Sequence, residues 1–491
     1  LEDKLQLHAA ADTLDLQWRG LKIKRMSLDG VVNQKGLEID HFSAFVGEKG
    51  VLLAEGSVSR KGQLQLKGKM TDFPIHPVLA AAGKEGSGLC STGFAVGGQL
   101  TAPEFAGIIQ LSEAEVLEQR IKEAHGFVSL KDNVLAIKNF RLNMEQGHHI
   151  VSGMVDLRGE EPYVDLSLET YGVRIEPIMQ LALGKKDVPV TGNLDNVMQV
   201  RGTASQPYVY GEVHASDGSA MEQLYNSVDG RYLYDKGTLE LENFLIKAFY
   251  ASIKLDGTMT SDGRLNLDMV AKDVDLAHLP IKDDTVDLGG KLNASGHVGG
   301  TLTAPTFRGD VDSDKVLING EAITELEGTV DGQGLAHNMF RVAFKQPYKH
   351  DPANYGLYTA DVNLNLQEKF MQGKVQMLWG DIGGLLRMAR MDYEINGQMQ
   401  GLLDFCPQGK GSGLNISVTA DDVKIHDLNY AHMALKGNIK KTLLTLDEVT
   451  LQEQQGITDH GLITAGGQIE LKDKQFNLSL ASVKANPAIA T

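Results

Sequence analysis

The pattern in this sequence that most resembles a metal site is a run of alternating acidic residues. Asp310, Asp312 and Asp314, with Glu321 at the twelfth position, copy the carboxylate spacing of a calcium-binding loop. Lys315, however, stands at the sixth position, where such a loop needs glycine for its turn. The alternation also fits a β-strand, on which the three aspartates would share one solvent-facing side. We therefore expect a strand here and no calcium site.

Histidine and cysteine, the usual ligands of zinc, are not grouped in the sequence. Cys90 and Cys406 are the only cysteines, and neither has a second cysteine nearby. His148 and His149 are adjacent, so on a strand they would point to opposite faces and would chelate a metal poorly. We expect two unpaired thiols and no metal at the histidines.

Signatures of nucleotide binding and hydrolysis are also missing. Residues 409–413 read Gly-x-Gly-x-Gly but lack the strand and helix that flank a phosphate-binding loop. No Gly-x-Ser-x-Gly motif is present, and His426 and His432 have no evident carboxylate partner in the sequence. The sequence therefore predicts no enzyme activity, no cofactor and no metal.

The overall composition narrows the class of protein further. The chain of 491 residues carries 47 Lys and Arg against 64 Asp and Glu, a net charge of −17, and has no basic cluster. Such a chain repels a phosphate backbone, so we expect no nucleic-acid partner. No apolar run approaches the ~18 residues that span a bilayer. The sequence opens at Leu1 in mid-pattern, so we expect a piece of a longer protein whose membrane anchor lies elsewhere.

A long internal repeat organises the chain. Pro103, Pro207, Pro305 and Pro407 follow one another at steps of 104, 98 and 102 residues, and in the first three copies a glycine follows the proline by four. Such self-similarity at a fixed period is typical of repeat architectures. It predicts one partial module and four further modules, which cover residues 1–87, 88–190, 191–288, 289–393 and 394–491.

Within each module the dominant hydrophobic period is two, which predicts strands with one apolar and one polar face. The Gly, Asp and Asn residues between the apolar runs fit hairpin turns. We predict about six strands per module and an all-β protein, a long, curled, mostly antiparallel sheet. Residues 112–124 are rich in helix formers, but the repeat aligns them with strand-like text, so we predict a strand there.

One short helix per module is expected as well. Apolar residues at i, i+3, i+4 and i+7 recur near the end of most modules, and the third copy, around Leu276 and Leu279, is shortened by Pro280. A helix of about ten residues is too small to cover the apolar face of six strands. The clear stripes are Ile75, Val78, Leu79 and Ala82, then Ile175, Ile178, Met179 and Ala182, and finally Ile382, Leu385, Leu386 and Ala389.

The candidate functional residues are therefore the apolar members of the alternating strands. Only 6% of the residues are aromatic, so this face would be a mainly aliphatic wall. The alternative is that the same residues form the ordinary core of a β-sandwich. The set comprises Leu64, Leu66, Met70, Val164, Leu166, Leu168, Leu265, Leu267, Met269, Val362, Leu364, Leu366, Phe476, Leu478 and Leu480.

Strings with the spacing Gly-x4-Pro-x3-Gly recur at residues 98–107, 202–211 and 300–309, and the segments 116–128 and 316–330 accompany them. In these features the chain resembles the AsmA-like superfamily over essentially its whole length. The resemblance implies a curled sheet that is U-shaped in section, with an apolar inner groove. It also implies a periplasmic section of a protein anchored in the inner membrane of a double-membraned bacterium.

Two functions follow from that resemblance. In the first, the groove carries phospholipid between the inner and outer membranes by holding its acyl chains, and so supports outer-membrane biogenesis. In the second, the sheet is a scaffold or chaperone for the assembly and secretion of outer-membrane proteins, with an outer-membrane β-barrel of the assembly-factor type as its partner. An enzyme or a repeat lectin would need a pocket with convergent polar groups, which the sequence does not show.

Overall fold

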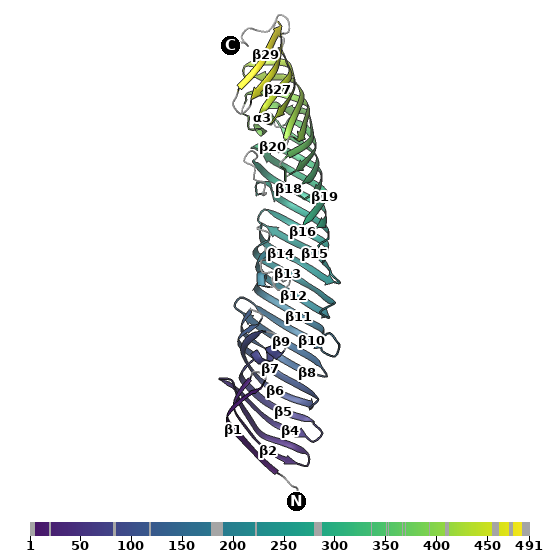
Figure 1. Ribbon diagram of the computed structural model, residues 1–491. Helices are drawn as coiled ribbons and strands as arrows, with labels where there is room; N and C mark the ends of the chain where they lie inside the picture. Colours follow the sequence, from purple (N-terminus) through teal and green to yellow (C-terminus); the bar gives the residue numbers. More distant parts are fainter. Residues whose placement is uncertain are drawn as a thin grey trace. The chain divides into compact units, whose positions relative to one another are not determined.

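The computed structural model of the chain is all-β, with a few short helical segments (Figure 1). The chain divides into two compact units, Leu1–Ile246 and Lys247–Thr491, and each is considered by itself. The structure describes residues 5–18, 21–81, 85–116, 119–177, 190–220, 223–278, 287–334, 336–349, 351, 353–365, 367–368, 370–391, 393–407, 412–453, 461–470 and 475–483.

The first unit contains strands β1 to β15 and one short helix, α1. Their bounds are β1 (Leu5–Trp18), β2 (Leu21–Asn33), β3 (Gly36–Val46), β4 (Gly50–Ser59), β5 (Leu64–Pro74), α1 (His76–Ala81), β6 (Gly86–Gln99), β7 (Ala102–Val116), β8 (Gln119–Lys131), β9 (Val134–Met144), β10 (His148–Asp156), β11 (Tyr163–Arg174), β12 (Val190–Gly202), β13 (Pro207–Ala220), β14 (Gln223–Asp235) and β15 (Thr238–Ala248), which reaches the boundary.

The second unit contains strands β16 to β29, the 3-10 turn η1 and the helix α3. Their bounds are β16 (Ala251–Thr260), β17 (Leu265–Asp275), η1 (Leu276–His278), β18 (Leu288–Thr301), β19 (Ala304–Ile318), β20 (Glu321–Gln333), β21 (His337–Pro347), β22 (Tyr355–Asn365), β23 (Phe370–Asp381), α3 (Ile382–Met388), β24 (Ile395–Pro407), β25 (Ser412–Ile425), β26 (Leu428–Lys440), β27 (Leu443–Glu453), β28 (Leu462–Glu470) and β29 (Gln475–Val483).

Strands that follow one another in the sequence are neighbours in the sheet. In the first unit successive strands pair antiparallel from β1–β2 through β13–β14. In the second unit the same holds from β16 to β29. The prediction of an all-β, antiparallel architecture is confirmed, while the division into five modules stays a prediction.

The predicted helical stripes are short in the structure. The helix α1 covers six residues and α3 covers seven, and Asp381 caps α3 by accepting from the Gly383 N–H at 3.1 Å. Residues 175–177 are helical, and residues 276–278 form the single turn η1. The remaining residues of those stripes, Ala82, Ile178, Met179, Ala182, Leu279 and Pro280, lie outside the described part of the chain.

The segment 112–124, predicted as a strand against its helix-forming composition, is extended in its described residues, 112–116 and 119–124. It belongs to two strands rather than one, because β7 ends at Val116 and β8 begins at Gln119, and these two residues face each other across the ladder. Cross-strand packing thus overrides the local helix propensity of the glutamates.

The recurring Gly–Pro strings form three alike hairpins. Gly98 pairs with Pro103 across β6 and β7, and Gly300 pairs with Pro305 across β18 and β19 in the second unit. Gly202 pairs in the same way with the proline that opens β13. These glycines have φ of 79°, 75° and 104°, and an added Cβ would lie 2.6, 2.4 and 2.3 Å from a carbonyl oxygen. The spacing of the string therefore reflects a hairpin that only glycine fits.

Pro407, the fourth proline of the series, stands in a different place. It is the last residue of β24 and pairs with Ser412, the first residue of β25. The other three prolines lie in the strand that follows the turn.

Four strands carry the same irregularity just before a helical segment. β5, β11, β17 and β23 each leave two residues out of the ladder with the next strand, and the second of the two has a positive φ. In three of them a side chain of the next strand accepts from the amide of that residue. The bonds are Asp72 N to Ser91 Oγ at 3.0 Å, Gly172 N to Asp195 Oδ1 at 2.6 Å and Asp273 N to Asn293 Oδ1 at 3.1 Å. These β-bulges bend the strand and turn its end toward the helix.

The buried side chains gather beside the helical segments. Ala114, Ile121 and Ala124 pack against Ile75 next to α1, and Val173 packs in a cluster with Ile175. The largest cluster has nine buried members and surrounds α3. In the described residues the core is thus a series of separate clusters at one end of the strands, rather than a layer along their whole length.

Candidate functional site

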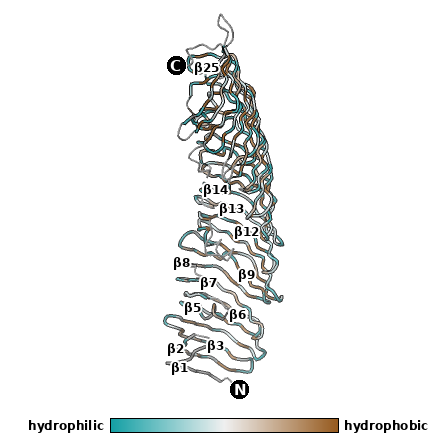
Figure 2. Tube along the Cα trace, turned by 45° about the horizontal axis from the view of Figure 1, so that its top comes forward, coloured by the Kyte–Doolittle hydropathy of each residue, from teal (hydrophilic) through white to brown (hydrophobic). Residues whose placement is uncertain are grey.

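The candidate site is the sheet face on which the helical segments pack, which we call the inner face. In the first unit this face carries Phe140 and Leu142, which contact the cluster beside α1. In the second unit it carries Tyr358, Met377 and Met399, which form a cluster with Ile382 of α3. Side chains alternate between the two faces along every strand, so these contacts fix which residues belong to the inner face. Figure 2 shows the alternation as changes between hydrophobic and hydrophilic colour along the strands.

In the second unit, an unbroken row of cross-strand neighbours runs along the inner face through all fourteen strands. Residues directly opposite each other in a ladder place their side chains on the same face. Every member is apolar or glycine. The row reads Leu255, Met269, Gly296, Gly309, Val330, Phe340, Val362, Gly373, Phe405, Leu414, Ile439, Leu444, Ile469 and Phe476.

A second row runs beside the first and is displaced from it by two residues on each strand. It too has only apolar or glycine members. The row reads Ile253, Ala271, Ala294, Val311, Gly328, Val342, Ala360, Val375, Leu403, Ile416, Gly437, Leu446, Gly467 and Leu478. At about 4.8 Å per strand, each row extends roughly 60 Å at right angles to the strands.

The first unit repeats this arrangement from β3 to β14. Its row contains only apolar, aromatic or glycine residues. The row reads Phe42, Ala54, Gly68, Phe94, Gly107, Val128, Ile137, Gly153, Leu166, Val200, Val209 and Tyr234.

The outer face gives the opposite result. The row one residue away from the first row of the second unit has a single apolar member, Val270. It reads Lys254, Val270, Ser295, Asp310, Thr329, Arg341, Asp361, Lys374, Asp404, Asn415, Asn438, Thr445, Gln468 and Asn477. Along these rows the continuous apolar character therefore belongs to the inner face.

Most of the candidate residues predicted from the sequence lie on this inner face. Leu64, Leu267 and Val362 are buried, at 6%, 8% and 7% exposure. The partly buried members are Leu66, Met70, Val164, Leu166, Leu168, Leu265, Met269 and Leu364. Partial exposure of so many aliphatic side chains shows that the helices leave much of this face uncovered.

The last group of candidates lies at the end of the described chain. Phe476 belongs to β29, where Leu478 and Leu480 are 40% and 69% exposed. Leu366 lies outside the described residues.

Sequence reasoning missed the inner-face residues of several strands. Phe94 and Phe105, on β6 and β7, belong to the same face as Leu66 but stand among glycine and alanine, so the period of two is faint there. The signal that identifies them is the hairpin register, which the recurring Gly–Pro string fixes.

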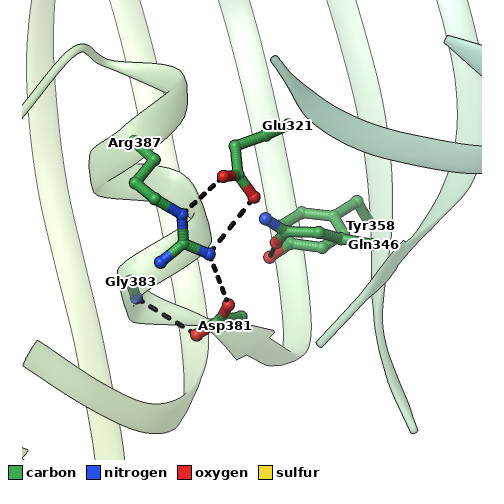
Figure 3. A network of polar contacts seen from close by, with 6 residues as sticks. All are labelled: Glu321, Gln346, Tyr358, Asp381, Gly383 and Arg387. Atoms are coloured by element: carbon green, nitrogen blue, oxygen red, sulfur yellow. Dashed lines mark hydrogen bonds and ion pairs between the residues drawn. The ribbon is translucent and has the colours of Figure 1, made fainter. Parts of the chain in front are cut away.

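A polar cluster fastens α3 onto the inner face (Figure 3). The Arg387 guanidinium on α3 donates to both oxygens of Glu321 on β20, at 2.5 and 3.2 Å, and to Asp381 Oδ2 at 3.3 Å. The Glu321 carboxylate raises the pKa of Arg387, mainly through these hydrogen bonds. Arg387 thus ties the helix to a strand 66 residues earlier in the sequence.

Tyr358 and Gln346 lie beneath this cluster and are almost fully buried. The Tyr358 hydroxyl donates to Gln346 Oε1, and burial strongly raises the pKa of the Tyr358 phenol. Gln346 is 1% exposed and its Nε2 has no partner. A Cβ at Gly384 would lie 2.1 Å from that nitrogen, so a larger residue here would require the Gln346 side chain to move.

The acidic run of the sequence has the structural outcome that the alternation predicts. Asp310, Asp312 and Asp314 are exposed on β19, and Glu321 is engaged by Arg387. Among the residues that the structure describes, no group of three or more His, Cys, Asp or Glu side chains is placed to hold a metal ion.

The two cysteines are unpaired, and the adjacent histidines contact side chains of β11. Cys90 is buried, which raises the pKa of its thiol, and Cys406 is partly buried; both are free. The His148 and Tyr171 rings are tilted by 34°, with centroids 5.3 Å apart. His149 Nδ1 lies 2.9 Å from Thr170 Oγ1, and burial lowers the pKa of His149.

The expectation that His426 and His432 lack carboxylate partners is wrong. His426 Nδ1 lies 3.3 Å from Glu394, and His432 Nδ1 lies 2.8 Å from Asp421, its neighbour across the ladder. Both pairs are exposed and stand apart from the apolar rows.

In comparisons with protein-family models, with curated proteins and with solved structures, none matches this chain. The resemblance to the AsmA-like superfamily therefore stays a prediction. Within the described residues, no helix is long and apolar enough to cross a membrane.

Proposed function

We propose that the inner face of each unit holds the acyl chains of phospholipids and lets them move along the apolar rows. The observation that carries this proposal is the pair of rows in the second unit, which cross fourteen strands without a polar side chain. Each methylene that leaves water for such a surface gains about 0.8 kcal/mol. Because successive positions are chemically alike, a chain that moves along the row meets no polar barrier.

The setting of this activity follows from the sequence resemblance. The Gly–Pro strings that suggest the AsmA-like superfamily also resemble the translocation and assembly module protein TamB. On this proposal the chain is a periplasmic part of an inner-membrane-anchored protein, its inner face is the floor of a groove, and its cargo is phospholipid on the way between the two membranes.

The experiment compares charges on the two faces of the same strands. The test variant carries Leu166→Asp and Val375→Asp, which place a carboxylate in an apolar row of each unit. The matched control carries Ser167→Asp and Gln376→Asp, one residue further along each strand and on the outer face. Native mass spectrometry measures bound phospholipid per chain, and a vesicle-to-vesicle assay measures lipid transfer.

We expect the control to retain lipid and transfer, and the test variant to lose at least fivefold in both, because an ionised carboxylate tolerates contact with hydrocarbon poorly. Circular dichroism verifies that both variants keep their strand content. Equal lipid in both variants, or no lipid in the native chain, would contradict the proposal.

A second function is favoured by the last described strand. Within the described residues β29 pairs on one side, with β28, and it exposes Leu478 and Leu480. Exposed apolar side chains on a strand can receive an extended segment of a client outer-membrane protein. Photocrosslinkers at Leu480 and, as a control, at Ile108 on the outer face of β7 distinguish the two functions, since a scaffold role requires client crosslinks at Leu480 alone.

A further inference from the structure

Trp379 occupies a backbone position that suits it poorly. It is the second residue of the β-bulge in β23, with φ of 54°. The equivalent bulges of β5, β11 and β17 carry Asp72, Gly172 and Asp273 at this place, which are residue types that tolerate a left-handed backbone. Among the described residues other than glycine that have a positive φ, Trp379 is the only one with an apolar side chain. Fold requirements therefore do not explain a tryptophan here.

Trp379 is also more than half exposed. It is 55% exposed, and the preceding residue, Leu378, is 49% exposed. Tyr355 on the neighbouring strand is 41% exposed. Trp379 and Leu378 are consecutive in β23, and Tyr355 belongs to β22, the strand that pairs with β23. Exposed Trp and Tyr side chains are the residue types enriched at protein–protein hot spots.

A hollow lies next to this cluster on the outer face. It has a volume of about 660 Å³ and is lined by Ala343, Leu357, Leu378 and Leu402, with polar residues around them. This departs from the polar character of the outer row described above. The hollow can receive an aliphatic side chain from outside the sheet.

The rim of the hollow is acidic. Lys345 forms an ion pair with Glu325 and lies 4.6 Å from the Tyr355 ring, so its charge is already compensated. Glu327, also at the rim, stands opposite Asp312 in the ladder between β19 and β20. The uncompensated charge at the rim is negative, and it favours a partner segment with basic side chains.

We propose that the surface formed by Trp379, Leu378, Tyr355 and the hollow is a docking site for a segment of a partner protein that alternates aliphatic and basic side chains. The aliphatic side chains fill the hollow beside Leu378, the adjacent Trp379 adds exposed apolar surface, and the basic side chains face Glu327 and Asp312. This site lies on the outer face and is independent of lipid binding on the inner face.

The probe is a fluorescein-labelled synthetic peptide of alternating leucine and lysine, and the control probe has glutamate in place of lysine. Fluorescence anisotropy with the full chain measures both. We expect the lysine peptide to bind at least tenfold more tightly than the glutamate peptide. Leu357→Asp and Trp379→Gly each weaken the lysine peptide at least tenfold, whereas Ile108→Asp, at an exposed position in the first unit, leaves it unchanged.

Stability separates a docking role from a structural one. Trp379→Gly relieves the left-handed backbone, so the unfolding midpoint is expected to stay the same or to rise while peptide binding is lost. A clear fall in the midpoint would assign Trp379 to the fold and overturn the proposal.

Other occupants give other results. Displacement of the peptide by vesicles of phosphatidylethanolamine and phosphatidylglycerol would assign the surface to lipid. Dimerisation in analytical ultracentrifugation that Trp379→Gly abolishes would assign it to a second copy of this chain. Equal affinity for the lysine and glutamate peptides would show that the acidic rim does not select a basic partner. Each of these outcomes contradicts the proposal.

Discussion

Arg387 on α3 and Glu321 on β20 form a two-pronged ion pair, with Nε to Oε1 at 2.5 Å and Nη2 to Oε2 at 3.2 Å. The two side chains are 24% and 19% exposed, so the pair is shielded from water more than a surface pair would be. The pair holds a helix of seven residues, which is too short to be stable by itself. Packing and this ion pair together keep α3 over the largest buried cluster.

Arg387→Met is expected to loosen α3. Removal of the cation leaves Glu321 partly buried without its main partner, which costs about 2 kcal/mol. Hydrogen exchange at the amides of α3 should become roughly 30-fold faster. The control is Arg308→Met, which breaks the exposed pair between Arg308 and Asp331. Its effect should stay below about 0.5 kcal/mol, and comparable acceleration in both variants would refute the assigned role of the pair.

Asp156 is expected to titrate at unusually low pH. Hydrogen bonds from the Arg158 side chain, and then from the Arg158 backbone N–H, lower the pKa of Asp156 from 3.8 to about 2. A depressed folded-state pKa stabilises the folded state above the unfolded value, so the contribution is present above about pH 4 and is lost as the pH falls toward 2.

Carbon-13 NMR of the Asp156 carboxyl group checks this directly. In Arg158→Gln the carboxyl pKa should move back toward its ordinary value. A native titration midpoint near 3.8 would show that the Arg158 contact does not persist in solution.

Gly98→Ala is expected to disrupt the hairpin between β6 and β7. Its φ of 79° disfavours any Cβ, and the new atom would lie 2.6 Å from the Ala102 carbonyl oxygen. The cost should reach about 2 kcal/mol or more. Gly97→Ala is the adjacent control, because the nearest atom to its Cβ is 3.9 Å away. Hydrogen exchange across the hairpin measures both, and equal effects would contradict the hairpin geometry inferred for all three Gly–Pro strings.

The sequence predicts those features of the structure that depend only on residues close together along the chain. The alternation in β11 and β17 identifies Leu166 and Met269 as members of one apolar face, because a period of two needs only neighbours along the chain. The rows themselves depend on register. Gly296 and Gly309 face each other in a row, and nothing in their local sequence separates them from turn glycines.

The bulges are a further limit on prediction from the sequence. Each one shifts the alternation, so Met377 faces inward while Leu378 and Trp379 leave the ladder before Gly380 resumes it. The pairing of His432 with Asp421 depends on the register of the hairpin between β25 and β26, which the local sequence does not give. The ion pair of Arg387 joins residues 66 positions apart, a distance at which no local pattern operates.

The two faces of β23 should respond very differently to loss of a side chain. Met377 is 1% exposed within the cluster around α3, whereas the adjacent Leu378 is 49% exposed on the outer face. Met377→Ala leaves a cavity among side chains that cannot collapse fully, and it should cost about 3 kcal/mol. Leu378→Ala removes a side chain that is about half exposed and lines an open hollow, so its cost should stay below about 1 kcal/mol. Urea unfolding measures the change in the free energy of unfolding for each variant. Hydrogen exchange at the amides of β22 to β24 measures the local change in stability. Similar losses in the two variants would mean that a further layer covers the outer face, and the assignment of inner and outer faces in this unit would then be wrong.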